Sequence, residues 1–369
     1  RQTTDDRMAV TGGYLGFLND EFYLVGGQRF MGRYNPMGPD FGPGFIQEYT
    51  NAIRRFGIDD DGSSMNIIGF TETTDTLELH RRDYNLVPQI FPNSEQGFTA
   101  FSGVFQYGSN VPWLNTVDIT SSGYSVTPVF EQLLNQYHTA HLPMYSATSN
   151  TMSTVFFGGI GRYYFDSSGQ LWDDTEVPFV NTISSVQRNG SGAMVETSIG
   201  SMPALLGAGS EFITDPNIPI MFNSIIDLDQ LSADTVLAGH IIGGIESSAA
   251  NIFFINTGTQ SAASTRVFRV LLVRDVNAGI IDQEKDPLSV TVSLNNEGNQ
   301  LLINVDLLSN GVVEMNILDS TGKLVRAVLN ARVPSGPQQF IENVKDLTAG
   351  VYYLDLVQGD QRNTVRFIR

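Results

Sequence analysis

Short apolar and β-branched segments, separated by polar turns, follow one another along most of this chain. An Asp-Asp-Asp-Gly turn at 59–62 separates residues 53–58 from residues 65–70, and an Asn-Gly-Ser-Gly turn lies at 189–192. Asp, Asn and Gly between two segments that alternate apolar and polar positions favour β-hairpins. The pattern therefore predicts an all-β protein.

An apolar segment that ends in two glycines recurs along the first three quarters of the chain. It occurs at 22–27, 155–159 and 241–244, with a degenerate copy at 101–103. Downstream of each copy, an Asn precedes a new apolar alternation, and these residues are Asn51, Asn115, Asn181 and Asn251. This near-constant period, with about four short strands per unit, predicts the radial repetition of four-stranded sheets found in a β-propeller.

These repeats resemble the kelch family, in which the second strand of each blade ends in Gly-Gly and the third begins near an Asn. In that family the glycine pair lets the backbone turn sharply beside the central channel. The resemblance implies four blades, at 8–75, 77–130, 137–200 and 204–275. A fifth blade ahead of Arg1 is left open, because a ring of four blades is small.

A different pattern begins after Pro287, where short alternating segments are separated by turns rich in Asn, Gly and Ser. Seven short strands in about 80 residues predict a small immunoglobulin-like sandwich. We expect 276–287 to be a linker between a propeller at 1–275 and this sandwich at 288–369. The predicted strands are 289–294, 300–305, 311–318, 324–329, 338–343, 350–356 and 364–368.

Three motifs in the sandwich are similar to the type IX secretion sorting domain of Bacteroidota. They are Gly-Asn-Gln-Leu-Leu-Ile-Asn-Val at 298–305, Asp-Ser-Thr-Gly-Lys-Leu-Val at 319–325 and Leu-Thr-Ala-Gly-Val-Tyr-Tyr-Leu at 347–354. The resemblance implies recognition by the type IX translocon and its outer-membrane shuttle, and a location outside the cell or on the outer-membrane surface. The residues of the implied sorting signal are Gly322, Lys323, Gly350, Tyr352, Arg366 and Arg369.

Two positions depart from that family's pattern. Val-Ser-Leu-Asn at 292–295 replaces the common Tyr-Pro-Asn-Pro, and Arg replaces Lys at the terminal positions. The second change preserves charge, and the first affects how tightly the domain is held. An accessory sandwich or a carbohydrate-binding module is the alternative interpretation of this region.

Composition narrows the classes of partner. The net charge of −18, from 39 acidic and 21 basic residues, opposes binding to nucleic acid or to anionic lipid. The absence of cysteine excludes disulfides, thiolate metal sites and the Cys-Tyr cofactor of copper-radical oxidases on kelch scaffolds. No apolar run is long enough to predict a transmembrane helix.

The densest cluster of ionisable residues is His-Arg-Arg-Asp-Tyr at 80–84, which we expect in the first strand of the second blade, along the channel. An Arg pair beside an acid suits a carboxylate or an anionic sugar, and an ion pair between blades is the structural alternative. Candidate ligand-binding residues are His80, Arg81, Arg82, Asp83, Tyr84, Trp113 and Trp172. The wider aromatic set that suits a sugar or a protein partner adds Tyr34, Phe41, Phe45, Tyr107, Tyr163 and Tyr164.

Other polar motifs carry weaker signals. His138 and His141 would lie on opposite faces of a strand, so we predict hydrogen-bonded structural roles and no metal site. Acidic turns at 59–61 and 173–174 suit structural calcium, with solvated turns as the alternative. Asp-Ser/Thr tripeptides that resemble the O-glycosylation motif of Bacteroidota place candidate acceptors at Thr76, Thr235 and Ser320.

No nucleophile elbow, phosphate loop or dinucleotide fingerprint is present. The sequence therefore favours an exported, non-enzymatic surface protein that binds a glycan or a protein, without a cofactor. Two alternatives remain. One is a glycan-active hydrolase or lyase that uses channel carboxylates, and the other is a coat or filament subunit.

Overall fold

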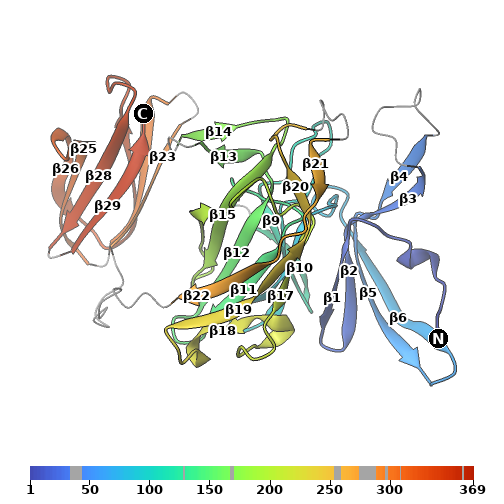
Figure 1. Ribbon diagram of the computed structural model, residues 1–369. Helices are drawn as coiled ribbons and strands as arrows, with labels where there is room; N and C mark the ends of the chain where they lie inside the picture. The colour runs from blue at the N-terminus through green and yellow to red at the C-terminus, as the bar shows by residue number, and fades with distance from the viewer. Residues whose placement is uncertain are drawn as a thin grey trace. The chain divides into compact units, whose positions relative to one another are not determined.

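The computed structural model describes residues 1–33, 44–127, 129–166, 170–252, 259–273, 288–295, 298–307, 309–359 and 361–369 (Figure 1). The chain folds into two compact units, Arg1–Asp275 and Val276–Arg369. Strands dominate both units, and the helices in the described residues are short 3-10 turns. The predicted all-β class is confirmed. Among the described residues, no helix is long and apolar enough to span a bilayer.

In the described part of Arg1–Asp275, four main antiparallel sheets follow one another in chain order, here numbered one to four. Sheet one contains β1 (Tyr14–Leu18), β2 (Glu21–Val25), β5 (Ala52–Asp60) and β6 (Met65–Thr74). Sheet two contains β7 (Asn85–Ile90), β8 (Gln96–Phe101), β9 (Thr116–Thr120) and β10 (Gly123–Thr127). Sheet three contains β11 (His141–Ser146), β12 (Thr151–Ile160), β15 (Phe179–Arg188) and β16 (Met194–Ser201), with the short β18 (Ile226–Asp227) parallel to β11. Sheet four contains β17 (Ser210–Thr214), β19 (Thr235–Gly243) and β22 (Phe268–Val273).

Three sheets carry a hairpin between their second and third strands. These hairpins are β3 (Gln28–Gly32) with β4 (Phe45–Tyr49), β13 (Tyr163–Phe165) with β14 (Leu171–Asp173), and β20 (Ile245–Ser247) with β21 (Ser261–Ala263). Sheet two has a loop at 102–115 in the same position. Because strand directions alternate within each sheet, these inserts lie at the end where the first strand of each sheet begins. We call this end the loop face.

The glycine pairs end or closely follow the second strand of their sheets. Gly158 and Gly159 have φ of 63° and 101°, and Ser102 and Gly103 adopt the same conformation, with φ of 60° and 99°. A Cβ on Gly158 would lie 2.0 Å from the carbonyl oxygen of Leu206. Both the left-handed backbone and the close approach of a neighbouring chain segment therefore require glycine there.

The predicted position of the third strand is correct in three sheets and wrong in the fourth. Asn51 and Asn115 immediately precede β5 and β9, and Asn181 lies within β15. Asn251 instead lies in the insert after β20, and the third strand of sheet four begins at Phe268. In sheets one and three the Asn follows the inserted hairpin, whereas Asn251 lies inside it, between β20 and β21, so the second half of the hairpin separates it from the third strand.

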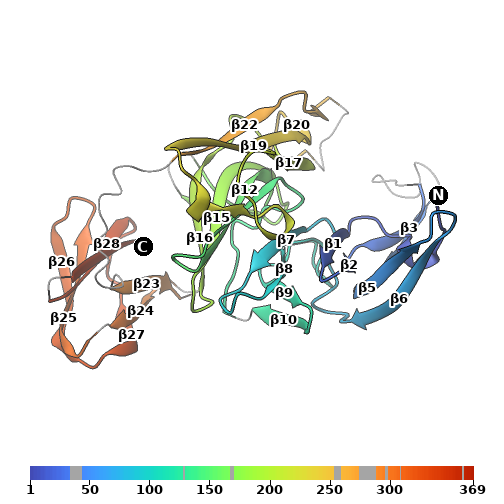
Figure 2. The ribbon, with the colours of Figure 1, turned by 90° about the horizontal axis from the view of Figure 1, so that it is seen from below.

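Adjacent sheets pack face to face, and sheet two lies between sheets one and three (Figure 2). Sheets one and two share an apolar core made of Leu18, Tyr23, Val25, Ile53, Leu79, Tyr84, Leu86, Phe98, Ala100, Val117 and Ile119. Residues of sheets three and four share a second one, which includes Leu142, Met144, Val155, Phe157, Ala238 and Ile241. Each such interface removes apolar surface from water, which is the main force that holds stacked sheets together.

The first strands of sheets two and three each contain a proline. Pro88 lies in β7 and Pro143 lies in β11, each opposite a residue of the second strand. Proline donates no backbone hydrogen bond, so it is tolerated on an edge strand. Pro88 fits the edge position of β7, and Pro143 lies just before the residues of β11 that pair with β18, Met144 and Tyr145.

In the described part of Val276–Arg369, seven strands form two sheets around one core. One sheet contains β23 (Ser289–Leu294), β24 (Gln300–Leu307) and β27 (Gly336–Asn343). The other contains β26 (Leu324–Val333), β25 (Gly311–Asp319), β28 (Val351–Gln358) and β29 (Gln361–Ile368). Both sheets contribute to the buried cluster that includes Leu301, Ile303, Met315, Ile317, Leu354 and Leu356. The seven strands predicted from the sequence are all present, and most of them are longer than predicted.

Candidate functional site

The prediction that residues 80–84 form a strand is wrong. The first strand of sheet two begins at Asn85, and a turn precedes it. The carboxylate of Asp75 accepts hydrogen bonds from the backbone N–H groups of Leu77 and Glu78, at 2.8 and 2.9 Å. Asp83 has a φ of 51°, in the left-handed region. Local side-chain capping and this φ are incompatible with extended backbone.

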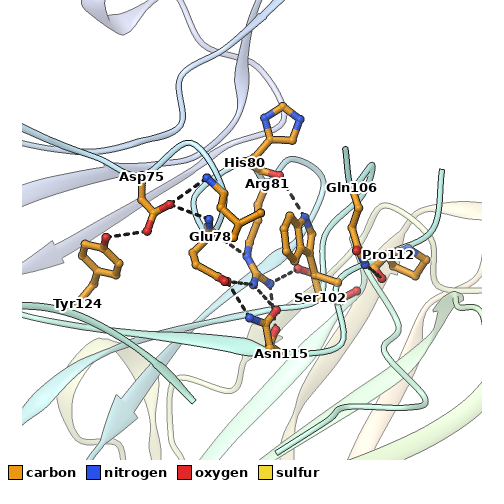
Figure 3. Close-up of polar contacts among 11 residues, drawn as sticks. Asp75, Glu78, His80, Arg81, Ser102, Gln106, Pro112, Asn115 and Tyr124 are labelled. Carbon is orange, nitrogen blue, oxygen red and sulfur yellow. Dashed lines mark hydrogen bonds and ion pairs between the residues drawn. The ribbon is translucent and has the colours of Figure 1, made fainter. Parts of the chain in front are cut away.

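Arg81 lies in the interior of the protein and is 2% exposed. Its guanidinium donates to the backbone oxygens of Glu78, Ser102 and Asn115, at 2.8, 2.7 and 3.0 Å, and to Asn115 Oδ1 at 2.7 Å (Figure 3). Burial lowers its pKa to about 10. The expectation that Arg81 faces a channel is therefore wrong, because its donors already join the turn before sheet two to the loop after β8.

Two further candidates from the sequence are buried near Arg81. Tyr84 is fully buried, and its hydroxyl donates to the backbone oxygen of Val25 at 2.6 Å. Trp113 is 7% exposed, and its indole N–H donates to the backbone oxygen of His80 at 3.1 Å. The Arg81 guanidinium lies 4.8 Å from the Trp113 ring centre. Both side chains support the turn and offer no free ring face.

His80 points away from the Arg81 network (Figure 3) and lies between two tyrosines. Its ring centre is 3.8 Å from that of Tyr49 and 3.9 Å from that of Tyr107, with interplanar angles of 21° and 23°. Its Nδ1 is 2.8 Å from Asn51 Oδ1. Burial lowers the pKa of His80, which favours the neutral imidazole. We call Tyr49, His80 and Tyr107 the ring stack. Tyr107 forms one end of this stack, and its side chain is 58% exposed.

Arg82, Asp83 and His138 form a loosely spaced group that we call the polar trio. Arg82 Nη1 lies 3.8 Å from Asp83 Oδ2, and His138 Nδ1 lies 3.8 Å from Asp83 Oδ1. The side chains of Arg82, Asp83 and His138 are 16%, 30% and 46% exposed. The Nε of Arg82 has no hydrogen-bond partner within the described residues. The three side chains are therefore partly exposed, and their closest contacts with one another are longer than a direct hydrogen bond.

Equivalent positions of all four sheets converge on the polar trio. Gly12, Asp83, His138 and Gly209 each lie just before a first strand, and their φ values are 67°, 51°, 50° and 71°. The Asp83 N–H donates to the Gly12 oxygen at 2.8 Å, and the Gly209 N–H donates to the His138 oxygen at 2.6 Å. A Cβ on Gly12 would lie 3.0 Å from Asp83 Oδ1. Gly12, before sheet one, thus leaves room for the Asp83 side chain, before sheet two.

Tyrosines surround the polar trio. Burial raises the pKa values of Tyr14 and Tyr137 well above the usual range, and the negative charge of Asp83 adds to the effect on both. Glu211, at the start of β17, raises the pKa of Tyr14 further. Burial raises the pKa of Tyr49 too, while the charge of Arg82 opposes the shift. These phenols stay neutral at physiological pH, so Arg82, Asp83 and Glu211 supply the charges here.

The remaining aromatic candidates lie elsewhere. Trp172 is 46% exposed on the β13–β14 hairpin, and its indole N–H donates to Asp166 at 2.9 Å. Tyr163 and Tyr164 lie on the facing strand β13, where Tyr164 is paired with Trp172. Phe45 stacks on Phe30 in the β3–β4 hairpin, with ring centres 5.4 Å apart. Tyr34 and Phe41 lie outside the described residues.

The proposed calcium turns are engaged within the protein. The carboxylates of Asp60 and Asp61 accept backbone N–H groups of their own turn, and Asp173 forms a two-point ion pair with Arg162, at 2.6 and 2.8 Å. Within the described residues, no group of three His, Asp or Glu side chains is placed to hold a metal ion.

His138 and His141 have different surroundings. His141 begins β11, and its Nδ1 lies 3.1 Å from the oxygen of Thr139. His138 lies before the strand, so the prediction that the two histidines lie on opposite faces of one strand is wrong. The candidate glycosylation residues Thr76, Thr235 and Ser320 are all exposed.

The residues of the implied sorting signal occupy one turn and the last strand pair of the second unit. Gly322 has a φ of 82° in the β25–β26 turn, where Asp319 accepts the N–H of Lys323 at 3.0 Å. Gly350 and Arg369 exchange backbone hydrogen bonds of 2.8 and 2.9 Å. Tyr352 stacks on Phe367 with ring centres 5.7 Å apart, and Arg366 is exposed on β29. The chain end is thus part of the folded sheet.

The sequence pattern singles out Arg82 and Asp83 but misses their partners. It pairs His138 only with His141, and it does not distinguish Tyr49 from other aromatic residues. The repeat itself carries a usable signal, because a residue with a left-handed backbone lies within three positions of the start of each first strand. Aligning the repeats on that position brings Gly12, Asp83, His138 and Gly209 together.

Comparison with known proteins identifies the second unit. Residues 289–369 match the family model described as a secretion system C-terminal sorting domain. No curated protein matches the chain.

Solved structures give weak overall likenesses. A fungal alcohol oxidase of the AA5 family, in complex with copper, is 10% identical with a TM-score of 0.35, covering 98% of this chain and 66% of that one. PorZ, a surface component of the type IX secretion system of Porphyromonas gingivalis, is 12% identical with a TM-score of 0.23, covering 96% and 50%. The pneumococcal glycogen-degrading protein SpuA is 11% identical with a TM-score of 0.17, covering 68% and 31%.

These likenesses are too weak to indicate an activity, and the chain spans at most about two thirds of each of those chains. The family match is specific to the region whose strands and turns carry the sorting motifs. It indicates interaction with the type IX secretion system. Residues 289–369 are therefore a C-terminal sorting domain, and the protein is a secretion cargo exported to the cell surface or the extracellular space.

Proposed function

We propose that Arg1–Asp275 is a kelch-like β-propeller that binds a ligand at its loop face, outside the cell and without catalysis. Four features support the fold. The four sheets follow one another in chain order, their second strands carry equivalent left-handed pairs, and their third strands follow inserts at one end. The residues just before the first strands also meet at one place. Radial repetition of sheets places such positions around a central axis.

The observation that carries binding is the polar trio. Arg82, Asp83 and His138 lie on loops positioned by rigid sheets, as ligand-binding residues commonly do. Their side chains are partly exposed, whereas Arg81 is buried and donates several hydrogen bonds within the protein. Of the five residues at 80–84, Arg81 and Tyr84 are therefore structural, and Arg82 and Asp83 are the ones that we propose face a ligand.

A surface-display assay tests export. We expect that removal of 288–369 abolishes recovery of the protein at the cell surface or in the medium, whereas the variant Arg81→Lys leaves display unchanged if it folds. Undiminished display of the truncated chain would contradict the role of the sorting domain. Immunoblots of periplasmic fractions separate failed export from degradation.

A glycan-active lyase or hydrolase is the second candidate, and the pairing of Asp83 with His138 favours it. Carboxylates and imidazoles are the side chains that enzymes most often use for proton transfer. Incubation of the protein with polysaccharides, followed by measurement of new reducing ends and of absorbance from unsaturated products, decides between the two functions. Product formation that His138→Gln abolishes would overturn the non-catalytic proposal.

A further inference from the structure

The four sheets of the first unit form a row with two ends. Their first strands contact one another in the order β1, β7, β11 and β17, and apolar clusters lie between neighbouring sheets. Sheet one therefore begins the row and sheet four ends it (Figure 2). In a row of repeats each member contacts only its neighbours, so the end members need a polar outer side to stay soluble. We call the outward sides of sheets one and four the end faces.

The end face of sheet one is apolar near its first strand. Leu18 of β1 belongs to the core shared with sheet two, so Leu15 and Phe17 point to the opposite side. Leu15 is 59% exposed and Phe17 is 44% exposed. The register pairs Phe17 with Phe22 of β2, and their ring centres are 4.9 Å apart. An apolar surface therefore extends over two neighbouring strands.

The N-terminal turn packs on the outer strands of the same face. The oxygen of Arg7 accepts a hydrogen bond from Arg54 of β5 at 2.6 Å, and the Arg7 guanidinium lies 4.0 Å from the ring centre of Phe70 on β6. Leu15 and Phe17 remain exposed beside it. Their surface continues around the β1 edge into a hollow of about 300 Å³, whose other side is lined by Leu86, Pro88 and Phe98.

The end face of sheet four is apolar across three strands. Phe212 of β17 packs on the core shared with sheet three, as do Val270 and Leu272 of β22. The residues that alternate with them point outward. The exposed apolar residues on this side are Ile213 of β17, Ile242 of β19, and Leu271 and Val273 of β22, which are 52%, 36%, 45% and 68% exposed.

Both end faces have the composition of a sheet side that packs against another sheet. Apolar side chains scattered singly over a surface are normal, whereas a contiguous apolar patch marks an interaction site. An antiparallel sheet with one side in water carries polar residues on that side. The exposed Leu, Ile, Phe and Val residues of sheets one and four depart from that pattern at the two ends of the row.

The two end faces are the two halves of one type of contact. Within the row, the side that a sheet turns toward its successor packs against the side that the successor turns toward its predecessor. Sheet four leaves a successor side exposed, and sheet one leaves a predecessor side exposed. A second copy of the chain therefore offers a match for each end face, whereas an unrelated partner would need to fit two different surfaces.

Local charge does not oppose contact between the end faces, because both signs are present on each. Arg54 forms an ion pair with Glu72 on sheet one. Glu211 and Arg269 lie on the outward side of sheet four, since the register places them opposite Ile242 and His240. The net charge of −18 repels copies at long range. Salt screens that repulsion beyond about 8 Å at physiological ionic strength.

We propose that copies of this chain associate head to tail, with the end face of sheet one packed on the end face of sheet four of a second copy. The contact continues the row of sheets from one copy into the next. Such a contact gives a closed ring where the rotation closes and an open filament where it does not. The inference goes beyond the proposed function, because it concerns a surface for self-association and not the ligand site. It gives a structural basis to the coat or filament subunit that the sequence leaves open.

Sedimentation velocity of the full chain tests self-association. We expect the mean mass to rise above that of one chain as the protein concentration increases about a hundredfold, from about 1 μM. The rise should be larger at about 0.5 M than at about 0.05 M salt, because screening removes the long-range repulsion and leaves the apolar contact. A contact made mainly of ion pairs would weaken with salt instead.

Variants with one charge on an end face identify the two surfaces. Leu15→Glu and Ile213→Glu should each weaken self-association by at least about tenfold, because the contact would bury an unpaired carboxylate. An equimolar mixture of the two variants should form a one-to-one pair, since each retains the end face that the other lacks. Val195→Glu places the same charge on β16 of sheet three, where Val195 is 57% exposed, and is the control expected to associate normally.

Thiol cross-linking tests the same pair of surfaces without added charge. The chain has no cysteine, so Leu15→Cys and Ile213→Cys each carry a single thiol. A bifunctional maleimide that spans about 10 Å, the spacing of packed sheets, should join the two variants when they are mixed. It should join neither variant to itself.

Three outcomes would overturn the proposal. These are the mass of one chain at every concentration and salt, unchanged association in both Leu15→Glu and Ile213→Glu, and a mixture of these variants that stays unpaired although both are folded. Thermal unfolding establishes folding, and Leu15→Ser and Ile213→Ser replace any Glu variant that does not unfold cooperatively. None of these outcomes bears on export or on ligand binding, which the display and polysaccharide assays test separately.

Discussion

The two faces of sheet two pack against the neighbouring sheets through different kinds of side chain. Val117 and Ile119 of β9 face sheet one and join an apolar core. Asp118 lies between them on the same strand, so its side chain points to the other face, toward sheet three. There it forms two hydrogen bonds with Arg188 of β15, at 2.6 and 2.8 Å, and both residues are buried.

The comparison shows that one repeat geometry tolerates two kinds of interface. The apolar face depends on volume and shape, and it accepts many side-chain combinations. The face toward sheet three, which we call the polar face, contains an apolar cluster as well, made of Val87, Phe101, Phe156 and Val186. It differs in also burying polar partners that satisfy each other, as Thr99 does when its hydroxyl donates to Asp118 at 2.6 Å. Loss of one partner there leaves a buried charge without compensation. The two faces should therefore respond differently to mutation.

The largest effect is expected at the polar face. Asp118→Ala should lower the free energy of unfolding by about 3–5 kcal/mol, because Arg188 remains buried without its partner. Trp113 and Trp172 are the only tryptophans and both lie in the first unit. Tryptophan fluorescence during urea denaturation of the full chain therefore reports on this unit. A loss below about 1 kcal/mol would contradict the difference between the faces.

A cavity at the apolar face should cost slightly less. Phe98→Ala should lower the free energy of unfolding by about 3 kcal/mol, because Phe98 is 2% exposed and packs between sheets one and two. The same fluorescence measurement applies. Phe98→Leu retains most of the volume and serves as the matched variant, with an expected loss of about 1 kcal/mol.

Joint replacement sharpens the comparison. Asp118→Leu combined with Arg188→Met should restore most of the stability lost in Asp118→Ala, to within about 2 kcal/mol of the natural protein, since apolar groups of similar size replace the whole pair. The double variant is compared with each single change in one set of denaturation curves. Additive losses would show that the pair is not an energetic unit.

A further effect appears as a slope of stability with pH rather than as a single loss. Burial raises the pKa of Glu196, on β16, to about 7. Its Oε2 accepts the Leu134 N–H at 2.9 Å, whereas Oε1 has no partner within the described residues. The folded state holds this proton better than the unfolded state, whose glutamate pKa is about 4.3. The resulting stabilisation is present below that value and is lost as the pH rises to about 7, by up to about 1.4 kcal/mol per pH unit.

The variant Glu196→Gln tests this dependence directly. It should flatten the decrease in stability between pH 4.5 and 7, while retaining the amide oxygen as an acceptor for Leu134. Urea midpoints at half-unit pH intervals are the measurement. An identical slope in both proteins would assign the pH dependence to other groups.

Local pattern was sufficient for the strands but not for the site. The hairpin turns at 59–62 and 189–192 and the seven strands of the sorting domain follow from alternation and turn chemistry alone. The period of the repeats located three of the four third strands, and it failed at Asn251 because that residue lies inside the β20–β21 hairpin rather than after it. Arg81 and Arg82 are neighbours with identical side chains, so no local rule separates the buried one from the exposed one.

The sequence by itself determined the all-β class, the repeat spacing and the sorting domain, because these depend on periodicities and motifs within a few residues. Only the tertiary structure decided that Asp83 meets His138 and that Gly12 makes room for them. These residues are far apart along the chain, and the packing of separate sheets brings them together. The charge balance of the site, and therefore its ligand class, depends on which side chains that packing buries.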